Sequence, residues 1–440
     1  MPKSPASAIL RRCDELSRIS EEPDRLTRGF LSPAMDDATT LVARWMQEAG
    51  LDTELDAAGN LIGTRRSERA DAPIFVMGSH LDTVRDAGRY DGVLGVLLAI
   101  DAAHRIGGRG LPFDLEVIAF ADEEGLRFGA PFLGSKALIG ELGDDLLELY
   151  DADGDSLREV IDRWNRDQTG APAADIRCRY AGRRCLGYLE AHIEQGPSLE
   201  ESGVPLGVLE ALACSWWLRL RFSGRAGHAG TTPMALRRDP MPAAAALVLE
   251  AERIALATPD LVATVGRLEA TPGAGNVIPG DVEMTLDVRH PDADTLSRAV
   301  DELLSAAASF AAKRGLGLTS ETLHREAGVT AAPELSRLLE AAAADADVPV
   351  DRLVVGAGHD ALIMARRMPI SMLLLRSPGG VSHHPDEAVE PGDVDDAARV
   401  MLRLLERLAD GSAWDGNPAR AADWLNSPAT CAATAPEMDG

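Results

Sequence analysis

Five short segments of this 440-residue chain carry acidic residues, and three of them also carry histidine: GSHLDTV, YDGVLG, DEEGLRF, EAHIEQGP and GVSHHPDE. Imidazole nitrogens and carboxylate oxygens are the ligands that divalent ions such as zinc and manganese accept in proteins. A single Asp-Gly or Glu-Glu pair is more often a turn or a solvated helix start. The five segments taken together therefore indicate a metal centre.

Two of these segments come directly after predicted strands. The apolar run at 74–80 predicts a buried strand that ends at His80, and DLEVIAFA at 114–121 predicts a second strand that is followed by Asp122. Helix-spaced apolar residues at 93–106 lie between them and end at a glycine pair. This alternation predicts an α/β fold with a mostly parallel sheet and helices on both faces, where reactive groups collect beyond the carboxyl ends of the strands.

The spacing of the acidic residues suggests how such a centre would work. Asp82, two residues after His80, can accept the second imidazole N–H and so fix the tautomer of the ring. Two divalent ions that share a water make it acidic enough to attack near neutral pH, and an adjacent carboxylate that binds no ion can carry its proton to a leaving amine. The neighbours Glu123 and Glu124 can divide the base and ligand roles.

The pattern of the chain changes between about 213 and 331. A strand at 216–222, an Ala-rich helix, two strands, a helix and a last strand near Leu316 follow the β-α-β-β-α-β order. We therefore predict a discontinuous catalytic domain at 1–212 and 332–410 and an inserted domain at 213–331. The tail at 411–440 has no sustained period and is predicted to be an appendage.

Composition narrows the class of protein. With 44 Lys and Arg against 70 Asp and Glu, the net charge of −26 disfavours nucleic acid and anionic membranes as partners. No apolar stretch approaches the ~18 residues of a membrane span, and the N-terminus has no signal-like apolar run, so we predict a cytoplasmic protein. Five scattered cysteines without a CxxC pair indicate neither a disulfide framework nor a thiolate zinc site.

The succession of motifs also resembles a known family. GSHLDTV, YDGVLGV, DEEG, HIEQGP, GHAGTTPM, NVIPG, GAGHDA and GVSHHP, found in this order between about Val42 and Ala409, are similar to the hydantoinase/carbamoylase-type amidase branch of the aminoacylase-like dinuclear metallohydrolases. This resemblance implies two divalent ions per subunit, zinc or manganese, and hydrolysis of a C–N bond in a ureido or carbamoyl group. It further implies that the inserted domain is a ferredoxin-like lid through which the protein forms a homodimer.

The resemblance implies a set of residues that build the metal centre. The predicted metal ligands are His80, Asp91, Glu124, His192 and His383, with Asp91 bridging the two ions. Glu123 matches the general base, and Asp82 is the further catalytic carboxylate beside His80. In the doublet His383–His384, His383 is the predicted ligand because it directly follows the GVS of the family pattern.

Other residues would hold the substrate. His228 resembles a lid histidine that stabilises the oxyanion and often reaches the partner subunit's site. Asn276 and Arg289 match substrate-holding positions, and arginine suits bidentate capture of a carboxylate. Gln195 and His359 are further predicted substrate contacts.

The motifs also rank the possible functions. DTVRDAGRYDGVLGV and AFADEEGLRFGAPFLGSKAL most resemble allantoate amidohydrolases, so the first predicted reaction converts allantoate to ureidoglycine, ammonia and carbon dioxide. The runner-up is an N-carbamoyl-L-amino-acid hydrolase or β-ureidopropionase, which needs the same machinery. The HIEQGP and GVSHHP segments disfavour a dipeptidase or aminoacylase of the wider clan. A catalytically idle binding protein is disfavoured because every expected ligand and the base are present.

Overall fold

The computed structural model describes residues 4–170 and 176–410, so the predicted tail at 411–440 lies outside the described residues. The described chain forms two compact units: unit 1 comprises residues 4–210, 331–353 and 359–410, and unit 2 comprises Ala211–Thr330 and Val354–Gly358. Unit 2 thus includes a short segment that the sequence assigned to the first domain. This segment contacts unit 2 through a main-chain hydrogen bond of 2.9 Å from Ala213 N–H to the oxygen of Val355 and through one of 2.7 Å from Nη1 of Arg289 to the oxygen of Gly356.

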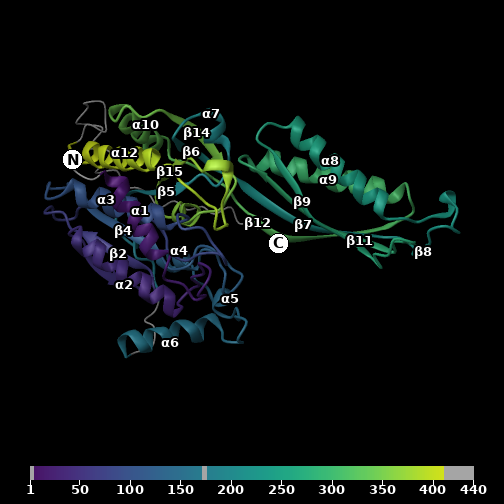
Figure 1. Cartoon of the computed structure of the whole chain (residues 1–440), viewed down its shortest axis with the longest axis horizontal. Coiled ribbons are helices and arrows are strands. Elements are labelled where there is room, and N and C mark those ends of the chain that lie inside the picture. The colour runs from purple at the N-terminus through teal and green to yellow at the C-terminus, as the bar shows by residue number, and fades with distance from the viewer. Residues whose placement is uncertain (1–3, 171–175, 411–440) are drawn as a thin grey trace. The chain divides into compact units, whose positions relative to one another are not determined.

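Unit 1 is built on a sheet with the strand order β1-β2-β4-β3-β5-β15-β6, and β14 also pairs with β6 (Figure 1). The four central strands β4, β3, β5 and β15 are parallel, whereas β1, β2 and β6 pair antiparallel at the margins. The strands are β1 (Asp52–Leu55), β2 (Leu61–Arg65), β3 (Ile74–His80), β4 (Asp114–Phe120), β5 (Cys185–Ile193), β6 (Leu206–Leu212), β14 (Val350–Val355) and β15 (Ile370–Leu375). The predicted α/β class with a mostly parallel central sheet is confirmed.

Helices cover both faces of this sheet. On one face α1 (Pro5–Leu16), α3 (Val93–Ile106), α10 (Pro333–Asp345) and α12 (Pro391–Asp410) contact one another, and α3 also contacts β3, β4 and β5. Leu189 and Ala191 of β5 belong to the same hydrophobic core as these helices. Glu190 points to the opposite face, because side chains alternate along a strand. There it accepts a hydrogen bond from Ala361 N–H at the start of α11 (Asp360–Met364).

The remaining helices of unit 1 are α2 (Pro33–Glu48), α4 (Leu133–Leu138), α5 (Asp144–Leu147), α6 (Leu157–Thr169) and α7 (Ser198–Ser202). Helix α2 contacts β1 and β2, and α4 contacts α11. Within 4–170 and 176–410, no helix combines the length and the hydropathy needed to cross a lipid bilayer.

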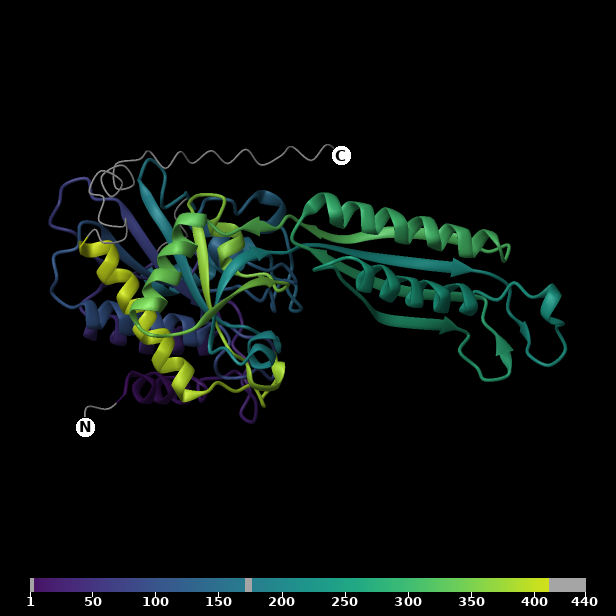
Figure 2. The ribbon, with the colours of Figure 1, turned by 90° about the horizontal axis from the view of Figure 1, so that it is seen from above.

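Unit 2 contains a four-stranded antiparallel sheet with the order β12-β7-β11-β9. Its main elements follow one another as β7 (Cys214–Ser223), α8 (Met241–Ala257), β9 (Val262–Thr271), β11 (Asp281–His290), α9 (Ala293–Ala312) and β12 (Gly317–Glu326). Figure 2 shows α8 and α9 side by side along the sheet, and alternate residues such as Leu220, Phe222 and Met284 form the core beneath them. The roles of this unit as a lid and a dimer interface stay predictions.

Smaller elements connect these strands. A two-stranded sheet pairs β8 (Gly227–His228) with β10 (Val277–Ile278), and β13 (Val329–Thr330) pairs with the end of β6. Two single-turn 3-10 helices cover Met234–Leu236 and Pro378–Gly380.

Close packing of α3 on β5 requires a glycine at position 95. A Cβ added there would lie 1.9 Å from the main-chain oxygen of Ala191 and 2.9 Å from Cβ of Ser79. The contacted atoms are the main chain of β5 and a Cβ of β3, so the clash cannot be relieved by turning a flexible side chain. The short distance from α3 to the sheet therefore depends on Gly95.

We predict that Gly95→Ala lowers the free energy of unfolding by about 3 kcal/mol or more, because overpacking against main chain forces the backbone to shift. Gly108→Ala is the matched control, since an added Cβ there meets nothing within 4 Å. Urea unfolding of both variants measures the difference. Equal stability of the two variants would show that α3 can move away from the sheet at little cost.

Candidate metal centre

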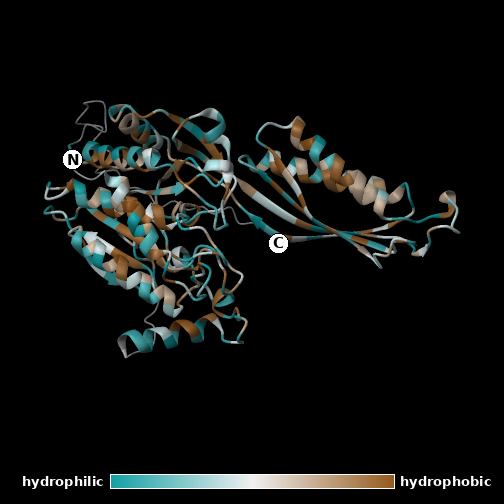
Figure 3. Cartoon of the chain, viewed as in Figure 1, coloured by the Kyte–Doolittle hydropathy of each residue, from teal (hydrophilic) through white to brown (hydrophobic). Residues whose placement is uncertain are grey.

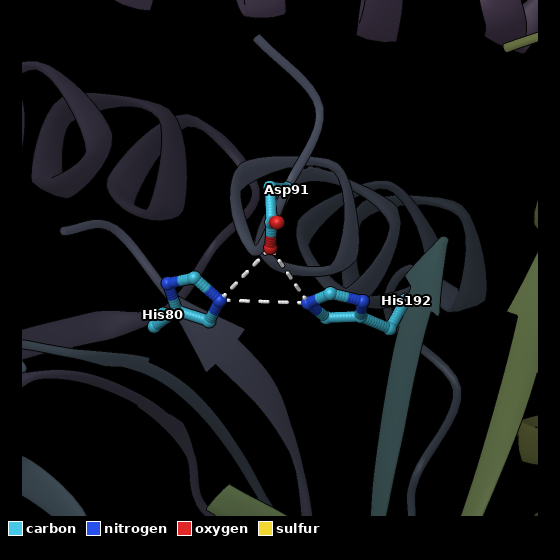
Figure 4. A group of neighbouring side chains, drawn as sticks. All are labelled: His80, Asp91 and His192. Atoms are coloured by element: carbon cyan, nitrogen blue, oxygen red, sulfur yellow. Dashed lines mark hydrogen bonds and ion pairs between the residues drawn. The ribbon is translucent and has the colours of Figure 1, made fainter. Parts of the chain in front are cut away.

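Two buried histidines lie abreast where β3 and β5 end. Gly78 of β3 pairs with Glu190 of β5 in parallel register, so His80 and His192, two residues further on, come to the same edge of the sheet. Their Nε2 atoms are 3.4 Å apart. Asp91 lies between them, with Oδ1 3.3 Å from Nε2 of His80 and 3.1 Å from Nε2 of His192 (Figure 4).

Main-chain oxygens orient both rings. Nδ1 of His80 lies 3.0 Å from the main-chain oxygen of Asp82, and Nδ1 of His192 lies 2.9 Å from that of Ile193. A carbonyl oxygen can only accept, so each Nδ1 carries a hydrogen and each Nε2 faces Asp91, where it can donate to the carboxylate when the ring is charged or bind a cation when the ring is neutral. The Asp82 carboxylate, the predicted partner of His80, is 3.4 Å from Nδ1. The shorter contact therefore comes from the main chain of that residue.

The Asp82 carboxylate joins the ends of two strands. It accepts hydrogen bonds from Glu123 N–H at 3.0 Å and from Glu124 N–H at 3.1 Å. This carboxylate is buried beside His80. It therefore holds the loop after β4, which carries the predicted base, against the end of β3.

A second group of ligand-type atoms meets the other oxygen of Asp91. Nε2 of His383 is 3.4 Å from Oδ2 of Asp91 and 3.4 Å from Oε1 of Glu124. The ring of His384 is instead 59% exposed and has Nδ1 3.6 Å from Oδ2 of Asp386. The structure thus brings the predicted member of the histidine doublet to Asp91.

The charges of the site fit a bound cation. Burial raises the pKa of Glu124 to about 7, and burial together with neighbouring carboxylates holds that of Glu123 well above its usual range. Burial also opposes ionisation of Asp91, but His192, His383 and His80 hold its pKa well below the usual range. A cluster of buried carboxylates needs compensating positive charge.

The geometry of the ligand atoms fits a metal ion as well. Asp91 Oδ1 is buried and has no hydrogen-bond partner among the described residues, although it faces two imidazole nitrogens. Ligands ~2.1 Å from a tetrahedral zinc ion lie ~3.4 Å from one another, which matches the spacing of these three atoms. Candidate metal-binding groups are His80–Asp91–His192 and Asp91–Glu124–His383, which share Asp91, together with His80–Glu123–Glu124 and Glu190–His192–His359.

Gln195 and His359 border this centre. Gln195 has a positive φ of 62°, and its Nε2 donates to Asp91 Oδ2 at 2.9 Å and to Ser382 Oγ at 3.1 Å. The ring of His359 is buried with its centroid 4.4 Å from that of His192. Burial and the neighbouring His192 hold the pKa of His359 well below its usual range, so its ring is neutral.

The predicted substrate-binding residues of unit 2 lie at opposite ends of that unit. His228 pairs with Val277 across β8 and β10, and the main-chain oxygen of Asn276 accepts from Ala229 N–H at 3.0 Å. Figure 1 shows β8 at the tip of unit 2, beyond the Asp281 end of β11. Arg289 lies at the other end of β11, about 26 Å along the strand from Asp281 at ~3.3 Å per residue.

Sequence reasoning missed two residues that position the centre. Glu387 is buried and its Oε1 accepts from Tyr90 N–H at 2.9 Å and from Asp91 N–H at 3.0 Å; burial raises its pKa to about 7. It lies in the segment GVSHHPDE, so its place in that motif was an available signal.

Arg28 is the second missed residue. It is fully buried, its Nε donates to the main-chain oxygen of Leu81 at 2.8 Å, and burial lowers its pKa to about 10 against the opposing effect of Asp82. No motif marks it, because it lies far upstream in a loop between α1 and α2.

Comparison with known proteins places this chain in a family. Residues 76–407 match the Peptidase family M20/M25/M40, and the chain belongs to that family. It is 38% identical over 437 residues to the allantoate deiminase of Arabidopsis thaliana, covering 91% of this chain and 82% of that protein. It is also 38% identical over 406 residues to the N-carbamoyl-L-amino acid amidohydrolase of Geobacillus stearothermophilus, covering 92% and 98%.

A solved structure agrees with this placement. The hydantoinase/carbamoylase family amidase of Burkholderia multivorans superposes with a TM-score of 0.85 at 32% identity, covering 92% of this chain and 98% of that one. The resemblance drawn from the sequence motifs is therefore confirmed.

For the histidine doublet we predict that His383→Ala lowers the metal content of the purified protein, because this ring lies within 3.4 Å of both Asp91 and Glu124. His384→Ala is the matched control, since its ring contacts Asp386 and not the centre. Elemental analysis after identical dialysis measures both variants. An equal loss of metal from the two variants would refute the choice of His383.

Proposed function

We propose that this chain is a metal-dependent amidohydrolase that cleaves a ureido C–N bond of a small carboxylate, with allantoate as the first candidate substrate. The proposal rests on the position of Asp91, which directs one carboxylate oxygen to His80 and His192 and the other to His383. The relatives named as an allantoate deiminase and an N-carbamoyl-L-amino acid amidohydrolase support this reaction class.

The residues of the centre would hold two divalent ions, zinc or manganese, in a chain that we place in the cytoplasm. His80 and His192 would bind one ion, Glu124 and His383 the other, and Asp91 both. When bound, such ions acidify a water molecule and polarise the carbonyl group that it attacks.

Glu123 would carry the proton. Its carboxyl group is buried beside Glu124 and His80, and burial raises its pKa, which makes it a stronger base than an exposed carboxylate. It would take a proton from the attacking water and deliver it to the terminal nitrogen of the ureido group. The C–N bond to that nitrogen then breaks and ammonia leaves. With allantoate, the remaining carbamate would lose carbon dioxide to give ureidoglycine.

Residues of unit 2 would hold the rest of the substrate. Arg289 would bind the carboxylate, since a guanidinium offers two parallel N–H donors to two oxygens. His228 and Asn276 would bind the ureido oxygen as charge develops on it, with Gln195 and His359 as further contacts from unit 1.

An N-carbamoyl-L-amino acid is the second candidate substrate. The Geobacillus stearothermophilus relative is as similar in identity as the plant deiminase, and the match covers more of its length. β-Ureidopropionate shares the carbamoyl and carboxylate groups of such substrates. Ammonia release from metal-loaded protein on allantoate, an N-carbamoyl-L-amino acid and β-ureidopropionate, measured side by side, separates these substrates.

Two copies of the chain would complete each site. A small substrate cannot contact His228 and Arg289 of the same unit 2, because about 26 Å of strand separates the two ends of β11. Unit 2 also offers a surface for a twin: Leu249 and Leu256 of α8 are 66% and 84% exposed, and the adjacent β9 is a sheet edge. Figure 3 shows α8 as hydrophobic over much of its length. Apolar helix faces and open edges favour symmetric pairing.

We predict that Glu123→Gln retains the metal but loses turnover by ~10²–10⁴-fold, because an amide of the same size cannot accept the proton. Ammonia release measures the activity, and elemental analysis measures the metal. Glu124→Gln is the matched control, since the loss of a ligand should lower the metal content as well. Near-parent activity of Glu123→Gln on every candidate substrate would refute its role as the base.

For the shared site we predict that a mixture of His228→Ala and Glu123→Gln chains regains activity that neither variant has alone. A mixed dimer would then contain one site in which both groups are wild type. Subunit exchange, followed by mass spectrometry of differently tagged chains, provides the control. Exchange without recovered activity, or a monomer by sedimentation, would contradict the shared site.

A further inference from the structure

Arg289 is held in place by a neighbour on its own strand. Nε lies 3.0 Å from Oδ1 of Asp287 and Nη2 lies 2.6 Å from Oδ2, so the lateral edge of the guanidinium forms a bidentate ion pair. Nη1 donates to the main-chain oxygen of Gly356 at 2.7 Å. All three residues belong to unit 2.

These contacts leave one edge of the guanidinium available. An arginine side chain has five N–H groups, and Asp287 and Gly356 engage three of them. The two that remain belong to Nη1 and Nη2, one on each. Gly356 lies on the Cδ side of the guanidinium, since a Cβ added there would be 3.9 Å from Cδ of Arg289, so the two unused N–H groups form the end edge of the fork, which matches the two oxygens of a carboxylate.

The surroundings of Arg289 keep this edge accessible and limit its rotation. The side chains of Arg289 and Asp287 are 27% and 31% exposed, so water and a ligand can reach them. The ring of Trp217, which is paired with Asp287 in the sheet register, has its centroid 5.7 Å from Cζ of Arg289. A planar cation that lies over an indole and is held by a bidentate carboxylate has little freedom to turn.

We propose that Asp287 is a positioning residue for substrate recognition: it holds the lateral edge of Arg289 so that the end edge is presented to the substrate carboxylate. This inference rests on the proposed function, in which Arg289 binds that carboxylate. Asp287 itself contacts no substrate, and its effect passes through the orientation of Arg289.

Removal of the Asp287 carboxylate has two opposing consequences. It deletes a negative charge close to the substrate carboxylate, which favours binding, but the pair is partly exposed and water screens that repulsion. It also frees a long side chain that must then be ordered by each substrate molecule. The loss of order is the larger effect at an exposed site, so Asp287→Ala weakens binding.

The test compares Asp287→Ala, Arg289→Leu and the double variant in the full-length, metal-loaded protein, on whichever of allantoate or an N-carbamoyl-L-amino acid the parent hydrolyses. We expect Asp287→Ala to raise KM about tenfold with kcat changed less than about twofold. We also expect it to have no further effect on KM in the Arg289→Leu background, because its action passes through Arg289. Glu321→Gln is the matched control, since it breaks the exposed ion pair with Arg219 on the same sheet.

The outcomes separate this inference from the proposed function. If Arg289→Leu raises KM and Asp287→Ala leaves it unchanged or lowers it, the positioning role is wrong and the carboxylate contact stands. A further rise of KM in the double variant, or the same rise in Glu321→Gln, also overturns the positioning role. If Arg289→Leu itself leaves KM unchanged, the proposed carboxylate contact is wrong.

Discussion

The site of unit 1 depends on the contacts between one buried carboxylate, that of Asp91, and three histidine rings. Asp91 has one oxygen within 3.1 to 3.3 Å of His192 and His80 and the other 3.4 Å from His383. Its burial would favour the neutral acid, and the three rings keep it ionised instead. A carboxylate that is ionised, buried and open on one oxygen would suit a bridging position between two cations, which is the basis of the proposed chemistry.

The rest of unit 1 holds the groups around Asp91 in place. Parallel pairing of β3 with β5 brings His80 and His192 to one edge, and Glu387 binds the main-chain N–H of Asp91. Gly92, with φ of 65°, lets α3 start directly after Asp91, where a Cβ would lie 2.5 Å from the His80 ring. These constraints act through main chain, rigid rings and the buried carboxylate of Glu387, so the ligand atoms are held from several directions.

The sequence predicted site residues that lie at the ends of strands. It did not predict Arg28 and Glu387, which contact the site from distant positions in the chain. His80 could be placed because an apolar run predicts its strand, and the edge of a parallel sheet collects such ends. Arg28 could not, since its partner Leu81 lies 53 residues away in the chain and no local pattern records that contact. The assignment of Val354–Gly358 to unit 2 depends on contacts with Ala213 and Arg289, which lie far away in the sequence and have no signature in side-chain hydrophobicity. The confirmed α/β class depended on periodicity over many residues, which is why it could be predicted.

The central claim is that Asp91 serves two metal ions at once. The most direct measurement is the metal content of Asp91→Ala compared with the parent protein, determined by elemental analysis after identical loading and dialysis. We expect two ions per parent chain and a loss of both in the variant, because each oxygen of Asp91 faces a different ligand group. A variant that keeps one tightly bound ion, or a parent chain that binds a single ion, would contradict it.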